Sequence, residues 1–397
     1  MKKRIEIITL IIVLIILVTL FVIFLMKVYK TNHKDTEYNK INDNKTYLQK
    51  RDYHVSKLPH LKTIEVEESH IKNIDEYLKA IHFNGAVTVL ENGKLKLNKG
   101  YGYQNFHHKT KNSPNTMYLI GSAQKFTTGL ILKKLENENK VNINDSVTKY
   151  LPWFETTKKI TLKDLMLHRS GLYKFEASPK TKSLDGAVHA IQARGIDEKF
   201  YHKHLYNDAN YLVLAQVIEV VTHKPYAANY YDDLAQPFSL QHSAFFNEKL
   251  YKKHMATGYK MIDGKLTAMK PNILDQYYGA GNLYMTPHDM GKLIYTLQQN
   301  KIFNARQTRP ILHEFGTQEY PEEYRYGFYI TPYLNRVNGV FFGQIFTVYF
   351  NDRYIVILGT NVSNTPGLVS NEDKMRHIFY NILDQKKPYN TAGVKVE

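Results

Sequence analysis

The chain has 397 residues, of which 43% are apolar and 23% are charged, a composition that argues against a disordered chain and suits a globular enzyme. It has no cysteine, which excludes a disulfide framework, a thiolate nucleophile, a cysteine-ligated metal and a lipidated cysteine. Its formal net charge of +16 indicates a polyanionic neighbourhood: anionic lipid, a phosphate-rich wall polymer or nucleic acid.

The N-terminus carries an uninterrupted apolar run from Ile7 to Met26, whose 20 residues would span about the 30 Å of a hydrocarbon core as a helix. No small-residue cleavage site follows the run, which favours a retained membrane anchor over a cleaved signal peptide. Basic residues at positions 2–4 favour a cytoplasmic N-terminus, although lysines also follow the run. A domain facing outward makes nucleic acid the weakest of the three partners, so we predict none.

The residues between the anchor and the first apolar pattern, about 31–68, are polar and of mixed charge, as a tether requires. These observations predict a cytoplasmic tail over residues 1–4, a transmembrane signal anchor over 5–27, an extracellular tether over 28–68 and a catalytic domain over 69–397.

The predicted domain begins with a helix and a β-hairpin. Apolar residues recur at helical spacing from Ile71 to Ile81. Two β-rich stretches, 85–90 and 94–97, then flank an Asn92-Gly93 dipeptide, which is the strongest short signal for a two-residue hairpin turn.

A candidate nucleophile follows at Ser122-Ala-Gln-Lys125, which comes after a strand-like stretch (117–120) and Gly121 and opens an apolar helix. At a helix start, free N–H groups and the positive end of the dipole favour an oxyanion. Lys125 lies on the same face as Ser122. A lysine partly desolvated in a cleft can lose its proton near neutral pH and accept one from the serine hydroxyl. We therefore predict Ser122 as the nucleophile and Lys125 as its partner.

Two other Ser-x-x-Lys matches occur, at 69–72 and 146–149. Neither has the strand-turn-helix context, and a helix cap explains Ser146 without chemistry. Context therefore selects Ser122.

A second candidate element is Tyr206-Asn207-Asp208, just before an apolar helix over 210–221. A tyrosine on a loop at a helix start should protrude, and its phenol can exchange a proton with the serine oxygen and then protonate a leaving oxygen. Among 31 tyrosines the ordinary interpretation is a half-buried packing residue, and only position favours Tyr206.

The C-terminal third is β-rich, with predicted strands over 326–330, 346–350 and 354–358, and it closes with an amphipathic helix over 373–383. The residues from 122 to 299 are mostly helical in pattern. The predicted fold class is α+β, with an antiparallel sheet built from N- and C-terminal strands beside a helical lobe.

Several motifs occur in an order similar to the signature of class C β-lactamases, DD-peptidases and related esterases. They are Gly121-Ser-Ala-Gln-Lys125 with Thr128, Leu165-Met-Leu-His-Arg-Ser-Gly-Leu172, Tyr206-Asn-Asp208, Pro237-Phe-Ser-Leu-Gln-His242, and Tyr278-Gly-Ala-Gly-Asn-Leu283 before Thr286-Pro-His-Asp289. The resemblance covers about residues 70–385 and implies a serine β-lactamase/DD-peptidase-like fold.

Over nearly its full length the chain also resembles the FmtA proteins of staphylococci, a group whose implied activity is removal of D-alanyl esters from teichoic acids, with weak β-lactam binding. On this resemblance the catalytic positions are those of Ser122, Lys125, Tyr206 and Asp208.

The sequence departs from the wider superfamily at two elements. The second element usually ends in asparagine, whereas Asp208 is a carboxylate that could hold Lys125 as an ammonium or bind a substrate amine. The third element is normally Lys or His followed by Thr-Gly on an edge strand, and here Phe341-Phe342-Gly343 aligns with it. The resemblance then implies substrate contacts from Asn207, Phe342 and Gly343, and an oxyanion hole from the N–H groups of Ser122 and Gln344.

A pocket without the usual cation offers little to a free carboxylate, whereas a D-alanyl ester of a polyol phosphate presents an ammonium and a polyanionic chain. We therefore predict a serine esterase that forms an acyl-enzyme and acts on teichoic acid. The alternatives are a low-affinity penicillin-binding protein or DD-carboxypeptidase that uses the same serine, and a catalytically silent protein that binds wall polymer.

Other polar and aromatic residues are given structural roles. We expect His168 and Ser170 to brace a buried turn, the glycines at 279 and 281 to allow close backbone approach, and Trp153 to pack in the core. The histidines show no metal-ligand spacing, so we predict no metal and no cofactor.

Overall fold

The computed structural model describes residues 14–27, 58–65, 68–363 and 367–387. Residues 14–27 are helical, and within the described ranges no helix combines the length and apolarity needed to cross a membrane. The predicted anchor over 5–27 lies partly outside these ranges, and the tail over 1–4 lies wholly outside them. Both stay predictions.

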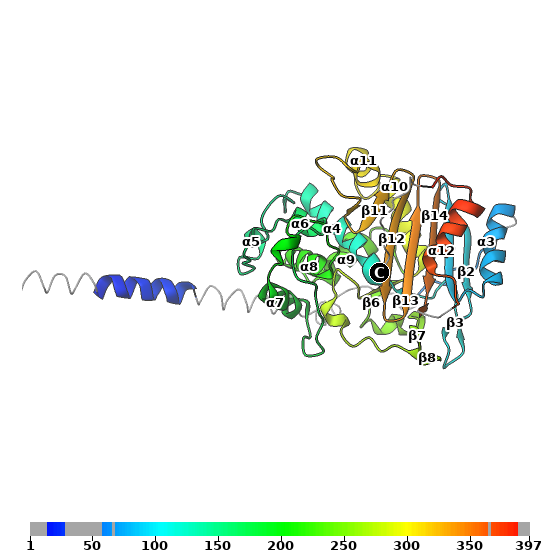
Figure 1. Ribbon diagram of the computed structural model, residues 1–397, viewed down its shortest axis with the longest axis horizontal. Coiled ribbons are helices and arrows are strands. Elements are labelled where there is room, and N and C mark those ends of the chain that lie inside the picture. The colour runs from blue at the N-terminus through cyan, green and yellow to red at the C-terminus, as the bar shows by residue number, and fades with distance from the viewer. Residues whose placement is uncertain (1–13, 28–57, 66–67, 364–366, 388–397) are drawn as a thin grey trace, which may run out of the picture.

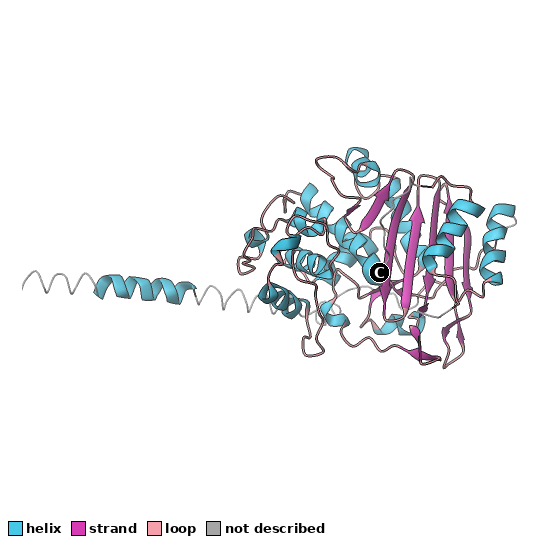
Figure 2. Cartoon of the chain, in the orientation of Figure 1, coloured by secondary structure: helices cyan, strands magenta, loops and turns pink. Residues whose placement is uncertain are grey.

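The centre of the domain is a seven-stranded antiparallel sheet with strand order β10-β11-β12-β13-β14-β1-β2 (Figures 1 and 2). The strands are β1 (Gly85–Glu91), β2 (Lys94–Tyr101), β10 (Tyr324–Arg325), β11 (Phe328–Thr331), β12 (Leu334–Phe341), β13 (Gln344–Phe350) and β14 (Tyr354–Thr360). β1 pairs with β14 along its whole length, from Gly85 opposite Thr360 to Glu91 opposite Tyr354. The prediction that strands from both ends build one sheet beside a helical lobe is confirmed.

The β1–β2 hairpin forms where the sequence predicts it. Asn92 and Gly93 both have positive φ, 48° and 74°, which is the type I′ turn that matches the twist of the two strands. β12 has no counterpart among the predicted strands, because Gly339 and the polar residues before it interrupt its apolar pattern.

Alternation along the strands separates two cores. Val87 and Val89 of β1 point to one face, where helix α3 (Ser69–Ala80) and α12 (Asn371–Arg376), continued by a π-helical turn (His377–Ile382), cover the sheet. Ala86 and Leu90 point to the other face, against α10 (Pro287–Gln298) and the helical lobe. The predicted closing helix is confirmed, although it begins earlier and loosens into the π-helical turn.

The helical lobe has α4 and α8 at its centre, and both are buried on nearly every face. Its α-helices are α4 (Gln124–Asn137), α5 (Val147–Tyr150), α6 (Leu162–Met166), α7 (Leu184–Arg194), α8 (Asp208–Thr222), α9 (Tyr226–Tyr230) and α11 (Ala305–His313). There are two small sheets: β5 (Tyr118–Leu119), β9 (Leu283–Met285) and β6 (Ser243–Phe245) form one, and β15 (Val362–Ser363), β7 (Tyr259–Ile262) and β8 (Lys265–Ala268) form another, which contacts β13 of the central sheet. β3 (Tyr103–Asn105) pairs with β4 (Thr110–Lys111).

Two expectations about packing need correction. Residues 58–65, placed in the tether, contact the domain: Ile64 exchanges two backbone hydrogen bonds of 3.0 Å with Asn98, and the carbonyl of Pro59 lies 2.8 Å from the His242 ring. Trp153 is not a core residue. It is 37% exposed and stacks on the ring of His189 at the surface, with centroids 3.9 Å apart.

Candidate active site

Ser122 lies on a single 3₁₀ turn, Gly121–Ala123, between β5 and α4. Gly121 has φ of 52°, a conformation that glycine adopts without strain, and this turn leaves Ser122 partly exposed. The backbone of β12 runs directly beside the turn, because a Cβ on Gly339 would overlap the carbonyl oxygen of Ile120 and lie 2.8 Å from the nitrogen of Ser122. The predicted strand-turn-helix setting of Ser122 is therefore present.

Close backbone contact also holds α4 against the loop between β10 and β11. Gly327 has φ of 86°, and a Cβ there would overlap the carbonyl of Lys125. A Cβ on Gly129 would likewise overlap the carbonyl of Tyr326. These glycines fix the helix that carries Lys125, and they explain why the predicted strand over 326–330 begins only at Phe328.

Lys125 is fully buried, and its Nζ lies 2.9 Å from Ser122 Oγ, 2.6 Å from Asp208 Oδ1 and 3.4 Å from the carbonyl oxygen of Ala280. Burial alone would lower the pKa of Lys125, but the carboxylate of Asp208 and the phenol oxygen of Tyr206 beside it outweigh burial and raise the pKa above its ordinary value. The resting site therefore holds an ammonium, not the free amine that desolvation alone predicts. The sequence leaves two roles open for Asp208, and its Oδ1 takes the first of them, which is to hold Lys125 as an ammonium.

Tyr206 protrudes at the start of α8 and is 37% exposed, as its position predicts. The Nζ of Lys125 lies 5.0 Å from the centre of its ring. The rings of His168 and Tyr324 pack against it, with centroids at 4.4 and 5.6 Å. Serine, lysine, tyrosine and aspartate thus meet around one ammonium.

Asn207 is 3% exposed, and its side chain is committed to the fold. Its Oδ1 caps α8 by accepting from the N–H of Ala209, and its Nδ2 donates to the carbonyl of Leu172 at 2.7 Å. The expected substrate contact from Asn207 is therefore corrected to a positioning role: it orients the residues on either side of it, Tyr206 and Asp208.

His168 and Ser170 brace this turn, as predicted. The Nδ1 of His168 accepts from the backbone N–H of Asn207 at 3.2 Å and from Asn210 Nδ2 at 2.9 Å, and Ser170 Oγ donates to Asn210 Oδ1. Burial and the neighbouring ammonium of Lys125 lower the pKa of His168 well below its ordinary value, so the ring is neutral.

Gly279 allows close backbone approach, as expected, whereas a Cβ on Gly281 would make only ordinary contacts, the nearest at 3.5 Å from the Phe341 ring. Gly279 has φ of 84°, and its carbonyl accepts from Thr128 Oγ1 at 2.7 Å. A Cβ there would lie 2.6 Å from that of Ala215 on α8. This packing places the carbonyl of Ala280 on Lys125.

Phe342 and Gly343 form the two-residue turn between β12 and β13, with φ of 44° and 78°. The turn packs on another part of the chain, because a Cβ on Gly343 would lie 2.6 Å from the nitrogen of Tyr259. The rings of Phe341 and Phe342 are in contact, and Phe341 also packs on Tyr277, with centroids 4.8 Å apart. Substrate contacts from Phe342 and Gly343 stay a prediction.

Gln344 does not supply a free N–H for an oxyanion. Its backbone pairs with Phe341 to close the hairpin. Its buried side chain accepts from the N–H of Leu119 at 2.9 Å and donates to the carbonyl of Ala256 at 3.2 Å. The expectation for Gln344 is therefore corrected: it ties β13 to the strand that leads into Ser122.

Val340 is the better placed donor, and sequence reasoning missed it. Since Phe341 and Gln344 form a hydrogen-bonded pair, the next pair, Val340 and Ile345, is not hydrogen-bonded, and the N–H of Val340 points away from β13. β11 pairs only with residues 334–336, so this edge of β12 is open and faces the Ser122 turn. The signal that sequence reasoning missed is Asn338-Gly339, which occupies the place that Thr-Gly has in the third element of the wider superfamily.

Within the described ranges, one group of side chains has metal-ligand spacing: Glu68, His70 and Glu91. Its carboxylates already pair with basic side chains, since Lys96 contacts Glu68 and Arg353 Nη2 lies 2.7 Å from Glu91 Oε1. This group is built as an ion-pair network and contains none of the residues around Ser122.

Comparison with known proteins shows which families and structures this chain resembles. The profile of the Beta-lactamase family matches residues 71–378. The chain is 58% identical over 366 residues to the teichoic acid D-alanine hydrolase of Staphylococcus aureus, covering 92% of this chain and 90% of that protein. The crystal structure of FmtA from Staphylococcus aureus superposes with a TM-score of 0.85 at 58% identity, covering 90% of this chain and 99% of that chain.

More distant structures share the fold. A penicillin-binding protein from Bacillus halodurans matches with a TM-score of 0.66 at 19% identity, covering 77% of this chain and 99% of that one. A D-amino acid amidase from Ochrobactrum anthropi SV3 matches with a TM-score of 0.64 at 18% identity, covering 78% and 99%. The fold, the extent of the profile match and the close relative agree, and the chain belongs to the beta-lactamase family.

Proposed function

We propose that this chain is a serine esterase that removes D-alanyl esters from teichoic acid through an acyl-enzyme on Ser122. The observation that carries the proposal is the Nζ of Lys125, held 2.9 Å from Ser122 Oγ and 2.6 Å from Asp208 Oδ1 in a buried site. The close relative named teichoic acid D-alanine hydrolase supports the substrate class. The apolar run at the N-terminus supports a role for residues 5–27 as anchor in the cell membrane, with the domain outside.

In the first half-reaction Tyr206 accepts the proton of Ser122 Oγ, and Oγ attacks the ester carbonyl carbon. The N–H groups of Ser122 and Val340 stabilise the resulting oxyanion, and the ammonium of Lys125 balances the charge as the proton moves. The bond to the polyol oxygen then breaks, and that oxygen takes the proton from Tyr206. In the second half-reaction Tyr206 takes a proton from the water that attacks the acyl carbon, and it returns this proton to Ser122 Oγ as the bond between the acyl carbon and Oγ breaks and D-alanine leaves.

The charges around the site favour an ester with a free amine over a substrate with a free carboxylate. Asp208 has 33% of its side chain exposed, and no described residue bonds its Oδ2, which is available to a substrate ammonium. The cation on β12, Arg336, is held by Glu372 through hydrogen bonds of 3.1 and 2.9 Å. It cannot serve as the carboxylate clamp of the third element.

Purified chain incubated with D-alanylated teichoic acid should release free D-alanine, measured with a coupled D-amino acid oxidase assay. Rapid labelling of Ser122 by a fluorescent penicillin without ester cleavage would instead favour a penicillin-binding protein. Salt-sensitive polymer binding without any acyl adduct in the mass spectrum would favour the non-catalytic wall-binding protein.

Asp208→Asn keeps the shape of the side chain and removes its charge. We expect kcat/KM for a D-alanyl ester to fall about 10- to 100-fold, since a hydrogen bond to a charged group is worth about 1.5–3 kcal/mol. The kcat/KM for a propionyl ester, which lacks the amine, should fall much less. Loss of the carboxylate also removes what raises the pKa of Lys125, so any kinetic limb that reports this lysine should move to lower pH. Equal losses for both esters would rule out ammonium recognition by Asp208.

Tyr324→Phe tests the aromatic shell. The Tyr324 hydroxyl is buried without a hydrogen-bond partner among the described residues, and burial together with the neighbouring charge of Tyr206 raises its pKa, so it remains a donor beside Tyr206. We expect kcat to fall about 3- to 10-fold, the worth of one hydrogen bond of about 1 kcal/mol that the Tyr324 hydroxyl would donate to Tyr206 during the reaction. Thermal stability should stay the same or rise, because an unpaired buried hydroxyl is removed. An unchanged kcat–pH profile would show that Tyr324 only packs.

A further inference from the structure

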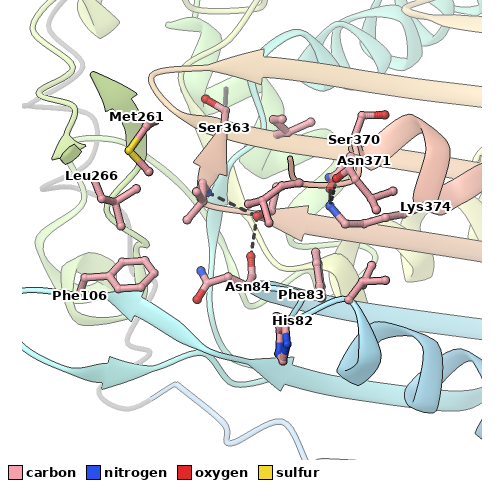
Figure 3. A pocket seen from close by; sticks show the side chains of 16 residues that line it. His82, Phe83, Asn84, Phe106, Met261, Leu266, Ser363, Ser370, Asn371 and Lys374 are labelled. Atoms are coloured by element: carbon pink, nitrogen blue, oxygen red, sulfur yellow. Dashed lines mark hydrogen bonds between the residues drawn. The ribbon is translucent and has the colours of Figure 1, made fainter. Parts of the chain in front are cut away.

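A second cavity, of about 700 Å³, lies between the β7–β8 hairpin, the ends of β1 and β14, and the start of α12 (Figure 3). None of its lining residues belongs to the site around Ser122. Its size is that of a small-molecule site, and its walls divide into a polar end and an apolar end.

The polar end has hydrogen-bonding capacity that the described residues leave unused. Ser363 Oγ and Asn371 Nδ2 are buried, each on a residue 3% exposed, and neither atom has a hydrogen-bond partner among the residues that the structure describes. Both residues line the cavity (Figure 3). Buried polar atoms are rarely left without partners, so two such donors in one cavity wall point to a missing acceptor.

Lys374 lies beside Asn371, whereas Ser363 lies farther along the cavity wall, toward Met261 (Figure 3). The Nζ of Lys374 donates to the carbonyl of Val369 at 2.7 Å and to Asn371 Oδ1 at 3.2 Å, and no carboxylate of a described residue lies within ion-pair distance of it. Burial lowers the pKa of Lys374 to about 8, which is the mark of an ammonium without a counterion. An anion in the cavity would supply both the missing charge and the missing acceptor.

The opposite end is apolar. Phe106, Met261 and Leu266 face the cavity in Figure 3, and Phe83 lies below the Lys374 side chain. Leu266, Leu368 and Val369, which also line the cavity, are 37%, 51% and 38% exposed. Large apolar side chains that gather at the mouth of a cavity mark a surface for an apolar ligand.

We propose that this cavity binds an amphipathic anion: a fatty acyl chain that lies along Phe106, Met261 and Leu266, with a carboxylate or phosphate head bonded to Lys374 and Asn371. The ligand can be a free fatty acid or a lipid of the bilayer, since both have this chemistry. The site is separate from Ser122 and does not depend on the proposed hydrolysis.

Binding of dodecanoate to the full chain, below its micellar concentration, tests the proposal by isothermal titration calorimetry. We expect one dodecanoate per chain. Lys374→Gln, which removes the charge, and Leu266→Glu, which places a like charge in the apolar wall, should each weaken binding at least 10-fold. Lys301→Gln, at an exposed lysine after α10, should bind as the unmodified chain does, and so should Ser122→Ala.

Two further measurements distinguish a bilayer lipid from a free fatty acid and test whether the ligand needs a charged head. Phosphatidylglycerol vesicles should bind in a Leu266-dependent way if a bilayer lipid is the source, with phosphatidylcholine vesicles as the uncharged comparison. Dodecanol should bind weakly, because it has the chain without the charge. The proposal is overturned if dodecanoate does not bind, or if it binds Leu266→Glu as it binds the unmodified chain. It is also overturned if inorganic phosphate displaces dodecanoate equally well from Lys374→Gln and Leu266→Glu. Leu266 is partly exposed, so its variant remains informative even if Lys374→Gln unfolds.

Discussion

Replacing Ser122 with alanine should abolish release of D-alanine from teichoic acid, with kcat/KM reduced about 10⁴-fold or more. In the proposed mechanism Oγ takes the acyl group, and removal of the nucleophile from a serine hydrolase leaves only binding and oxyanion stabilisation. The measurement is the initial rate of D-alanine release, together with an intact mass spectrum after exposure to an activated ester. The spectrum should show an added acyl group on the unmodified chain and none on Ser122→Ala.

The sequence offers a matched control for this variant. Ser146 also begins a Ser-x-x-Lys match, but its hydroxyl contacts Thr148 Oγ1 at 2.8 Å on an exposed turn. Ser146→Ala should keep the activity and the adduct. The fold of Ser122→Ala should be intact, because Lys125 retains its bond of 2.6 Å to Asp208. Equal rates for Ser122→Ala and the unmodified chain would contradict the assignment of the nucleophile.

Lys125→Met should lower kcat/KM about 10³-fold or more. The substitution removes the ammonium that contacts Ser122 Oγ and Asp208 and that balances charge next to Tyr206, so neither the proton transfer nor the position of Oγ is maintained. Stability should fall, because the substitution leaves the carboxylate of Asp208 without its partner, but the loss should be limited because 33% of the Asp208 side chain is exposed to water.

The double variant Lys125→Met/Asp208→Asn tests whether the pair acts as a unit. With the propionyl ester, which has no amine for Asp208 Oδ2 to bind, its loss of activity should be close to that of Lys125→Met alone, since residues that act on one step give non-additive effects. Lys149→Met is the control, because Lys149 forms an exposed i,i+4 pair with Asp145 and should be silent. Losses that add fully in the double variant would show that Lys125 and Asp208 act independently.

Local signals in the sequence were enough for most of the elements that carry the site. The Asn92-Gly93 hairpin, the strand and glycine before Ser122, and the helix after Tyr206-Asn207-Asp208 were all predicted at their places. Each depends on residues within a few positions of one another: a turn that needs positive φ, an apolar period, or a cap.

Other features depended on contacts between distant segments. The protonation of Lys125 is set by Asp208, 83 positions away, because charge and burial act through space. Asn207 and Trp153 were misjudged for the same reason: hydrogen bonds to the 168–175 loop bury Asn207, whereas no part of the domain covers Trp153 fully. Residues 58–65 looked like tether, and only their contacts with Asn98, Asn115 and His242 place them on the domain.

The oxyanion donor separates the two kinds of information most clearly. The sequence by itself determined the fold family, the nucleophile candidate and the absence of the usual carboxylate-binding cation, because these are properties of residue type and local order. Only the tertiary structure shows that the N–H of Val340, and not that of Gln344, points toward the open edge of β12 beside Ser122. Alternate N–H groups of an antiparallel strand point to opposite edges, so the assignment depends on the register of β12 against β13 and on which edge faces Ser122.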